Sequence, residues 1–203
     1  MLIIVNQDNR ADEHVALRSM FEARKRVFVD LLKWDLPVLA DRFEVDHFDD
    51  PHATYLIVTD GRREHLASAR LLPTTRPALL DGLFAYLVAG PVPKDAATFE
   101  ITRFCLSPEI GARQRRAARD TLLAGLVEHA RAHRITTYTG VAEVSWFRQV
   151  EQFGWECRLL GETAIHDGRA LVALAIAIGP DTLAKLAETG IIAGGLDASA
   201  EAA

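Results

Sequence analysis

The sequence predicts a single α/β (α+β) domain in which helices flank a mixed central sheet. The chain has 203 residues, of which 49% are hydrophobic, so it can bury one sizeable core. Two apolar runs in its first half are joined by the turn residues Asp60 and Gly61, a pattern typical of a hairpin. In its second half, apolar runs of strand length alternate with longer helical patterns, which favours a mixed sheet.

The first half is expected to begin with a short aliphatic strand at 2–5. Residues 12–34 carry apolar side chains three and four positions apart, which predicts a helix that faces a core. The polar segment 35–52 is expected to be a long loop, and such loops in compact domains are usually functional or disordered. The apolar runs at 54–59 and 66–72 are the two strands of the predicted hairpin.

The second half contains four further expected strands and four expected helices. The strands are expected at 98–106, 135–142, 156–160 and 170–178. Helices are expected at 78–88, at 112–132, at 145–153 before the stop residue Gly154, and after Pro180. The domain is therefore placed at residues 1–192, and the tail 193–203 is expected to be disordered.

Composition and charge exclude several classes of protein. The net charge of −5 argues against general nucleic-acid binding, and two cysteines do not make a disulfide framework. The first residues lack the pattern of a secretion signal, and no apolar run approaches the roughly 20 residues of a membrane helix. No glycine-rich nucleotide-binding loop is present. We therefore expect a cytoplasmic protein with no nucleic-acid partner and no membrane insertion.

Two groups of charged residues stand out near the start of the chain. Arg24 lies in the apolar stripe of the predicted helix. One interpretation is that its aliphatic stem runs along the edge of the stripe and its guanidinium reaches solvent. The other is that the guanidinium binds a carboxylate in a cleft. The segment EVDHFDD places Asp46 and Asp49 three positions apart. These aspartates either belong to a solvated acidic loop, or they face a cleft, bind a cationic substrate and order Arg24 or Arg70.

Glu100 and Arg103 lie inside the apolar strand predicted at 98–106. Buried charges need partners, so these two residues either form structural ion pairs or take part in chemistry. Their odd separation would place them on opposite faces of a regular strand. A shared face therefore requires a bulge or a break between them.

A cluster of arginines crowds the start of the helix predicted at 112–132. Cations oppose the dipole at a helix N-terminus, so this surface is either a solvated face or a site for a phosphate or an acidic protein. The arginines are Arg113, Arg115, Arg116 and Arg119.

In the same region, His129 and His133 lie four positions apart without an evident third ligand, so no metal site is expected.

Over about residues 1–180 the chain resembles the acyl-homoserine-lactone synthases, the LuxI-type autoinducer synthases. The resemblance rests on the blocks KRVFVDLLKWDLP, FEVDHFDD, SARLLPTTRPALL and FEITRF, which follow one another in this order. It implies a fold similar to that of the GCN5-related N-acetyltransferases. It also implies synthesis of an N-acyl-homoserine lactone from S-adenosylmethionine and an acyl thioester, with release of methylthioadenosine. S-adenosylmethionine is then a substrate, and no cofactor or metal is implied.

The resemblance also implies roles for individual residues. Glu100 matches the family's proposed base, and Arg103 belongs with it to the catalytic set. S-adenosylmethionine would be bound by Arg24, Phe28, Trp34, Asp46, Asp49 and Arg70. We expect the acyl chain to contact Phe84, Phe104, Val141 and Trp146. The acyl donor, either acyl carrier protein or acyl-coenzyme A, would dock on Arg113, Arg115, Arg116 and Arg119.

Two departures leave the acyl group and its donor open. Glu143 stands where familiar members have a small or hydroxyl residue, so acyl length, oxidation at the 3-position and aliphatic or aryl character are not fixed. Residues 111–117 match the acetyltransferase pyrophosphate loop poorly, which favours a carrier-protein donor. The alternatives are an acyl-coenzyme A N-acyltransferase of the same fold class acting on another amine, and a synthase-like binding protein without activity.

Overall fold

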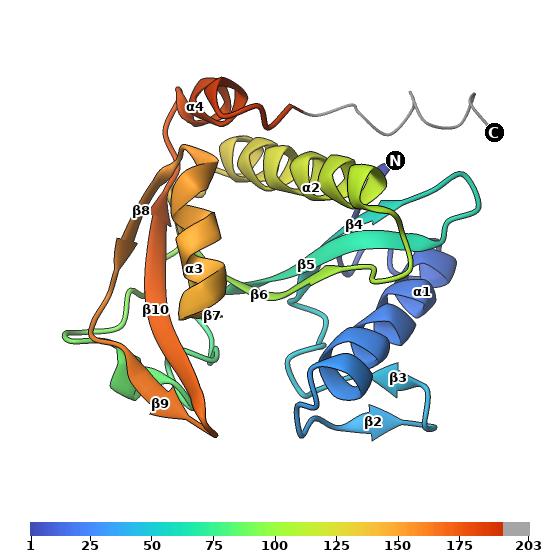
Figure 1. The fold of residues 1–203 in the computed structure, drawn as a ribbon, viewed down its shortest axis with the longest axis horizontal. Helices are drawn as coiled ribbons and strands as arrows, with labels where there is room; N and C mark the ends of the chain where they lie inside the picture. Colours follow the sequence, from blue (N-terminus) through green and yellow to red (C-terminus); the bar gives the residue numbers. More distant parts are fainter. Residues whose placement is uncertain (193–203) are drawn as a thin grey trace. The chain divides into compact units, whose positions relative to one another are not determined.

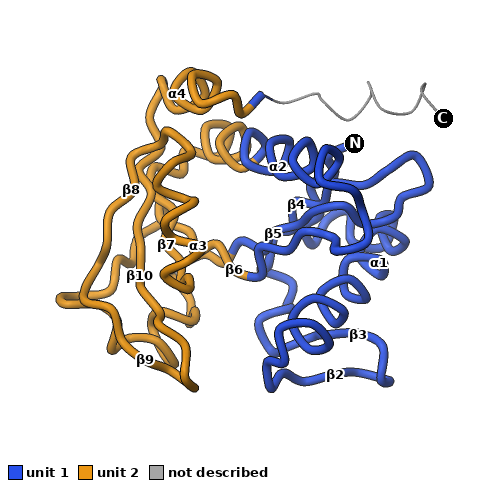
Figure 2. Tube along the Cα trace, in the orientation of Figure 1, with its two compact units in different colours: residues 1–71, 103–125, 192–203 blue, residues 72–102, 126–191 orange. Residues whose placement is uncertain are grey.

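The computed structural model describes residues 1–192 and divides them into two compact units (Figure 2). The first unit comprises Met1–Leu71 and Arg103–Gly125, together with Ile192, and the second comprises Leu72–Thr102 and Leu126–Ile191. The tail expected to be disordered, 193–203, lies outside the described residues. The proposed single-domain boundary at residue 192 stays a prediction.

The first unit is built on three antiparallel strands in the order β1-β4-β5 (Figure 1). Nearly every residue of β4 and β5 is buried, as expected of aliphatic and β-branched runs that are covered on both faces. A register shift between Val58 and Thr59 accompanies the predicted hairpin turn. The strands are β1 (Leu2–Val5), β4 (Thr54–Thr59) and β5 (His65–Pro73), whose last two residues fall in the second unit.

The helix predicted at 12–34 is divided into two kinds of helix. It begins as α1 (His14–Arg24) and continues as the π-helix η1 (Lys25–Leu31), in which Leu32 N donates to Val27 O. π-helical segments are rare and occur frequently at functional sites. The expected loop 35–52 is ordered and contains a two-stranded sheet. Its strands are β2 (Val38–Leu39) and β3 (Phe43–Glu44).

The second unit holds the strand order β6-β7-β10-β8, with β9 also paired to β10. The pairing of β6 with β7 is parallel and the pairings of β10 are antiparallel, so the predicted mixed sheet is confirmed. Its strands are β6 (Thr98–Leu106), β7 (Thr137–Glu143), β8 (Glu156–Leu159), β9 (Ala164–His166) and β10 (Arg169–Ala177). β6 begins in the second unit and ends in the first.

Helix α3 packs against β7 and β10 in the second unit (Figure 1). It is followed by the 3-10 turn η3 and by Gly154, whose positive φ of 93° confirms the expected stop. The helices of this unit are α3 (Val144–Val150), η3 (Glu151–Phe153) and α4 (Thr182–Glu188). Helix α2 (Ala112–Ala132), which has the predicted bounds, begins in the first unit and ends in the second.

Two expectations about local structure were wrong. The helix predicted at 78–88 is a series of turns with only the 3-10 segment η2 (Ala85–Leu87). Gly82 lowers helix propensity there, and its N–H closes a tight turn onto Leu79 O. The three-residue strand β9 was not predicted. No helix between residues 1 and 192 is both long enough and apolar enough to span a bilayer.

Candidate active site

Arg24 at the end of α1 is a buried, paired arginine. Its side chain is only 1% exposed, so it does not run along the edge of the helix toward solvent. The guanidinium donates two parallel hydrogen bonds to Asp49, from Nη1 to Oδ1 at 2.8 Å and from Nη2 to Oδ2 at 2.9 Å. Its Nε donates to Glu44 Oε2 at 2.5 Å. Such two-pronged contacts fix both partners in orientation.

The acidic loop is folded around its own carboxylates. Asp46 Oδ1 accepts the N–H of Phe48, and Asp49 Oδ2 accepts the N–H of Asp46, both at 2.8 Å. Arg70 on β5 reaches Asp46 through Nη1 and Nη2, at 2.6 and 3.0 Å, and its Nη1 lies 2.9 Å from Asp49 Oδ1. The aspartates therefore do order Arg24 and Arg70, and the loop is not a solvated acidic segment.

Arg103 enters the same group of charges from β6. Its Nη2 donates to Glu44 Oε1 at 3.0 Å and to Asp46 Oδ2 at 2.9 Å. Its backbone has a φ of 51°, a left-handed conformation that is uncommon for a residue with a side chain. The alternation of buried and part-exposed residues along β6 also shifts at this position. The irregularity of β6 thus lies at Arg103 itself, no break separates Glu100 from Arg103 within the strand, and a shared face for the two side chains stays a prediction.

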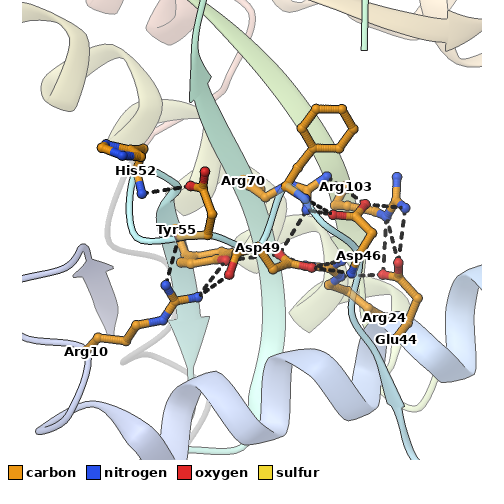
Figure 3. A network of polar contacts seen from close by, with 11 residues as sticks. Arg10, Arg24, Glu44, Asp46, Asp49, His52, Tyr55, Arg70 and Arg103 are labelled. Carbon is orange, nitrogen blue, oxygen red and sulfur yellow. Dashed lines mark hydrogen bonds and ion pairs between the residues drawn. The ribbon is translucent and has the colours of Figure 1, made fainter. Parts of the chain in front are cut away.

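We call these six charged residues the ion-pair cluster; they carry three positive and three negative charges (Figure 3). Burial disfavours every one of these charges, but the opposite charges and hydrogen bonds more than offset it. The pKa values of Asp46 and Asp49 are consequently lowered, and those of Arg24 and Arg70 are raised. The members are Arg24, Glu44, Asp46, Asp49, Arg70 and Arg103.

Sequence reasoning missed three residues that complete this region. Glu44 is fully buried and pairs with both Arg24 and Arg103. Tyr55 donates its hydroxyl to Asp49 Oδ1 at 2.9 Å, and Arg10 donates to that hydroxyl at 3.0 Å and to two loop carbonyls (Figure 3). The signal for Glu44 was present, because it lies two positions before Asp46 in the acidic motif and so can share its direction in an extended chain.

An aromatic pair lies beside the cluster in the same unit. The rings of Phe28 and Trp34 stack with centroids 4.9 Å apart, and Trp34 N donates to Phe28 O across the end of the π-helix. The guanidinium carbon of Arg103 lies 5.7 Å from the centroid of the Phe28 ring. The structure therefore brings together Phe28, Trp34 and the charged residues that the sequence assigned to S-adenosylmethionine. Such rings can also bind a further cation over their faces.

Glu100 lies in the second unit, and its surroundings are different. The side chain is buried, with the residue 1% exposed, and Oε2 accepts the N–H of Leu80 at 3.1 Å. Leu80 belongs to an apolar cluster with Leu87, Leu171 and Ala173. A carboxylate held by a backbone N–H in a mainly apolar environment can accept a proton from a substrate amine, which is the function of a general base.

The residues expected around the acyl chain are only partly brought together. Phe84 and Val141 both pack on the apolar cluster of the second unit. Trp146 on α3 instead contacts Phe153 edge to face, with centroids 5.9 Å apart. Phe104 belongs to the first unit. Phe84 and Val141 are therefore two acyl-pocket candidates that pack on the same apolar cluster.

The arginines of α2 differ in their contacts within the protein. Arg119 pairs with Asp120 through hydrogen bonds of 2.6 and 2.8 Å. Arg115 donates to Ser107 O at 2.9 Å. Arg113 and Arg116 are exposed. Among residues 1–192, no group of three or more histidine, cysteine, aspartate and glutamate side chains is placed to hold a metal ion.

The comparisons with known proteins agree with this arrangement. The family model described as autoinducer synthase matches residues 8–182. This chain belongs to the autoinducer synthase family. An acyl-homoserine-lactone synthase of Rhizobium etli is 33% identical over 177 residues, which cover 86% of this chain and 83% of the relative. The family resemblance stated from the sequence is thus confirmed.

Solved structures give the same result for the fold. The CoA-dependent acyl-homoserine lactone synthase MesI is similar with a TM-score of 0.85 and 28% identity, covering 96% of this chain and 97% of that chain. The CoA-dependent acyl-homoserine lactone synthase BjaI, solved with SAM and isopentyl-CoA, has a TM-score of 0.84 and 27% identity, covering 94% and 89%.

The expected likeness to N-acetyltransferases is also confirmed at the level of the fold. An acyl-CoA N-acyltransferase from Pseudomonas aeruginosa is similar with a TM-score of 0.59 and 17% identity, covering 87% of this chain and 99% of that chain. At this identity the likeness concerns the arrangement of helices and strands alone.

Proposed function

We propose that this autoinducer synthase transfers an acyl group from a thioester to the amine of S-adenosylmethionine and then closes the lactone ring. The observation that carries the proposal is the ion-pair cluster beside the stacked Phe28 and Trp34 rings. S-adenosylmethionine carries a carboxylate, an amine and a sulfonium. Its recognition therefore calls for a guanidinium, a carboxylate and aromatic rings, and the first unit provides all three.

Within the cluster, Arg103 and Asp46 are the members best placed to contact the substrate. Their side chains are each 8% exposed, whereas the other four are at most 1% exposed. We assign Arg103 to the substrate carboxylate and Asp46 to its amine or sulfonium. Arg24, Glu44, Asp49 and Arg70 hold these two residues in position. The cluster is electrically balanced, which suits a substrate that is itself partly zwitterionic.

The proposed acylation uses Glu100 as its base. The nitrogen of the substrate amine attacks the thioester carbonyl carbon, a C–N bond forms, and the C–S bond breaks with release of a thiol. Glu100 accepts the proton that the attacking amine loses, directly or through water, and this proton then passes to the departing sulfur to give the free thiol. The apolar residues Phe84 and Val141 exclude water from the acyl chain.

Lactone closure requires no additional reagent in this proposal. A substrate carboxylate oxygen attacks the γ-carbon, the bond from that carbon to sulfur breaks, and the sulfonium leaves as methylthioadenosine. This step depends mainly on holding the carboxylate in line with the leaving sulfur, which is the task given to Arg103. S-adenosylmethionine is consumed as a substrate, and the proposed reaction uses no cofactor or metal. We place the protein in the cytoplasm, where both substrates are made.

The donor is proposed to be an acyl thioester that docks at the start of α2. Arg113 and Arg116 are exposed there, and either a phosphopantetheine arm or coenzyme A brings phosphate to them. The carrier-protein donor expected from residues 111–117 stays a prediction. It competes with coenzyme A, the donor class in the descriptions of MesI and BjaI.

The decisive experiment incubates the purified protein with S-adenosylmethionine and a panel of acyl-carrier-protein and acyl-coenzyme A thioesters. Mass spectrometry should detect an N-acyl-homoserine lactone and one equivalent of methylthioadenosine for the accepted donor. The second candidate is an acyl-coenzyme A N-acyltransferase that uses another amine. Thiol release that does not depend on S-adenosylmethionine, with no methylthioadenosine, would establish that candidate instead.

A further inference from the structure

One buried hydroxyl in the second unit has no place in the proposed chemistry so far. Thr139 on β7 is paired with Glu100 on β6, and this is the last pair of their parallel ladder. Both residues are only 1% exposed. Residues paired in register point to the same face of a sheet, and neighbouring strands are about 4.8 Å apart. The Thr139 side chain therefore lies next to that of Glu100.

The two strands are closely packed at this point. A Cβ added to Gly140, the next residue of β7, would lie 3.1 Å from the carbonyl oxygen of Ile101, the next residue of β6. The absence of a side chain at Gly140 therefore permits a close approach of the two backbones. Because the backbones are held together just beyond the pair, Thr139 cannot move away from Glu100 without separating the strands.

The hydroxyl of Thr139 also lacks a partner of its own. Within residues 1–192, no hydrogen-bonding partner is found for Thr139 Oγ1, although the atom is fully buried. Buried hydroxyls are bonded in the large majority of cases, because an unmade hydrogen bond is costly. The same face of β7 continues with Val141, which packs on the apolar cluster and offers no acceptor. The carboxylate of Glu100 is the adjacent acceptor.

We propose that Thr139 is a positioning residue for Glu100, and that its hydroxyl donates a hydrogen bond to the Glu100 carboxylate during acyl transfer. The inference rests on the proposed function, because it presupposes that Glu100 is the base. Leu80 N–H already holds Oε2, and a carboxylate accepts several hydrogen bonds at once. Rotation about the Cα–Cβ bond of Thr139 is sufficient to direct the hydroxyl toward the carboxylate.

The hydrogen bond has a measurable consequence for pH dependence. It favours the ionised form of Glu100, so the base should remain active to lower pH than it would without Thr139. The charged groups on the neighbouring elements are engaged elsewhere. Glu143, on the same strand as Thr139, pairs with Arg169 of β10 at 3.2 Å. Asp81, next to Leu80, pairs with Lys94, and Arg103 on β6 belongs to the ion-pair cluster.

The test compares the pH dependence of kcat in three full-length proteins, at saturating concentrations of S-adenosylmethionine and of the accepted acyl thioester. The first is Thr139→Val, which removes the hydroxyl and keeps the shape. The second is Thr139→Ser, which restores the hydroxyl. The third is Thr59→Val, a matched control that removes another buried hydroxyl without a partner among the described residues, on β4.

In Thr139→Val the acid limb of kcat should move up by about one pH unit, because a hydrogen bond to a charged group is lost. The ratio of kcat on the acid limb to kcat on the plateau should fall by up to about tenfold for the same reason. Thr139→Ser should recover most of that ratio, and Thr59→Val should match wild type. The melting temperature of each variant shows whether it is folded under the assay conditions.

Two outcomes would overturn the inference. The first is an unchanged acid limb together with an unchanged kcat on the plateau in Thr139→Val, which leaves Thr139 as a β-branched residue that packs in a strand. The second is a loss of activity by the same factor at every pH. A failure of the proposed function is recognised separately, because wild-type protein would then release no methylthioadenosine from S-adenosylmethionine.

Discussion

The ion-pair cluster of the first unit and the surroundings of Glu100 in the second unit hold buried charge in opposite ways. In the cluster, three guanidiniums and three carboxylates neutralise one another. Glu100 is held instead by the backbone N–H of Leu80 among apolar side chains. Changing one member of the cluster therefore endangers the fold, whereas changing Glu100 should affect the chemistry and leave the fold intact.

The largest expected effect is on stability, from Arg24→Ala. The substitution leaves Asp49 buried without its two-pronged partner and Glu44 without one of its two arginines, which should lower the free energy of unfolding by about 3–5 kcal/mol. Urea denaturation of the purified variant measures it. Arg18→Ala is the matched control on the same helix, because the pair of Arg18 with Glu22 is exposed and should contribute less than about 1 kcal/mol. Equal effects of the two changes would refute the distinction drawn here.

Glu100→Gln tests the other side of the comparison. The amide keeps the shape of the side chain and can still accept the Leu80 N–H, so the melting temperature should stay close to that of wild type. Removal of a general base should lower kcat for acyl transfer by about a hundredfold or more. Lactone formation followed by mass spectrometry gives the rate. Near-normal turnover at neutral pH would make Glu100 a structural residue.

A third prediction concerns His65, a buried neutral side chain in the first unit. Burial and the positive charge of Arg26 lower the pKa of His65 to about 3, from an ordinary value of about 6.5. Protonation therefore favours the unfolded chain, and stability that is complete above pH 6.5 is lost as the pH falls toward 3. From pH 7 to pH 5 the loss from this one group should be about 2 kcal/mol.

Urea denaturation of His65→Asn at both pH values checks this assignment, because the variant should lose that part of the pH dependence. The aspartates of the cluster do not contribute in this window. Their pKa values are lowered, so their stabilising effect persists until the pH falls below the ordinary value of about 3.9. If the free energy of unfolding changed equally between pH 7 and pH 5 in wild type and in His65→Asn, His65 would be excluded as the source of the change.

The smallest expected effect is at the exposed start of α2. Reversal of charge in Arg113→Glu with Arg116→Glu should raise the KM for the acyl donor several-fold at low salt and change the KM for S-adenosylmethionine little. Arg131→Glu with Arg134→Glu makes the same change of charge near the end of this helix and serves as the control. Steady-state kinetics with each substrate varied in turn give the two KM values for both double variants. A donor KM that does not respond leaves these arginines as a solvated face.

Local sequence patterns predicted most of the fold. For the ion-pair cluster they indicated only some of the pairs between arginines and carboxylates. A charged residue inside the apolar stripe of a helix requires a partner, and this requirement gave a carboxylate partner for Arg24 as one of two alternatives, which the contact with Asp49 confirms. The spacing placed Glu44 two positions before Asp46, but it did not show that Glu44 is the second partner of Arg24. The paired positions are 20 or more residues apart, and only the folded loop brings them into contact.

The missed elements also depend on contacts between separate segments. Residues 78–88 carry buried leucines at helical spacing, but Leu80 uses its N–H to hold Glu100 and Gly82 closes a turn. The hydrogen bond that holds Glu100, the proposed base, is thus absent from any pattern within the segment itself. The strand β9 spans only Ala164–His166 and is recognised by its pairing with β10, which is also a contact between separate segments.

The charge balance of the ion-pair cluster also bears on how the family can change over time. A single substitution among the six residues passes through a protein with an unmatched charge in its interior, so these positions can be replaced only in compensating sets. Natural selection would therefore keep Arg24, Glu44, Asp49 and Arg70 even in a descendant that had exchanged its substrate. If these four positions were invariant across relatives, the cause could be the instability of a protein with one unmatched buried charge. Such invariance would not by itself identify the ligand.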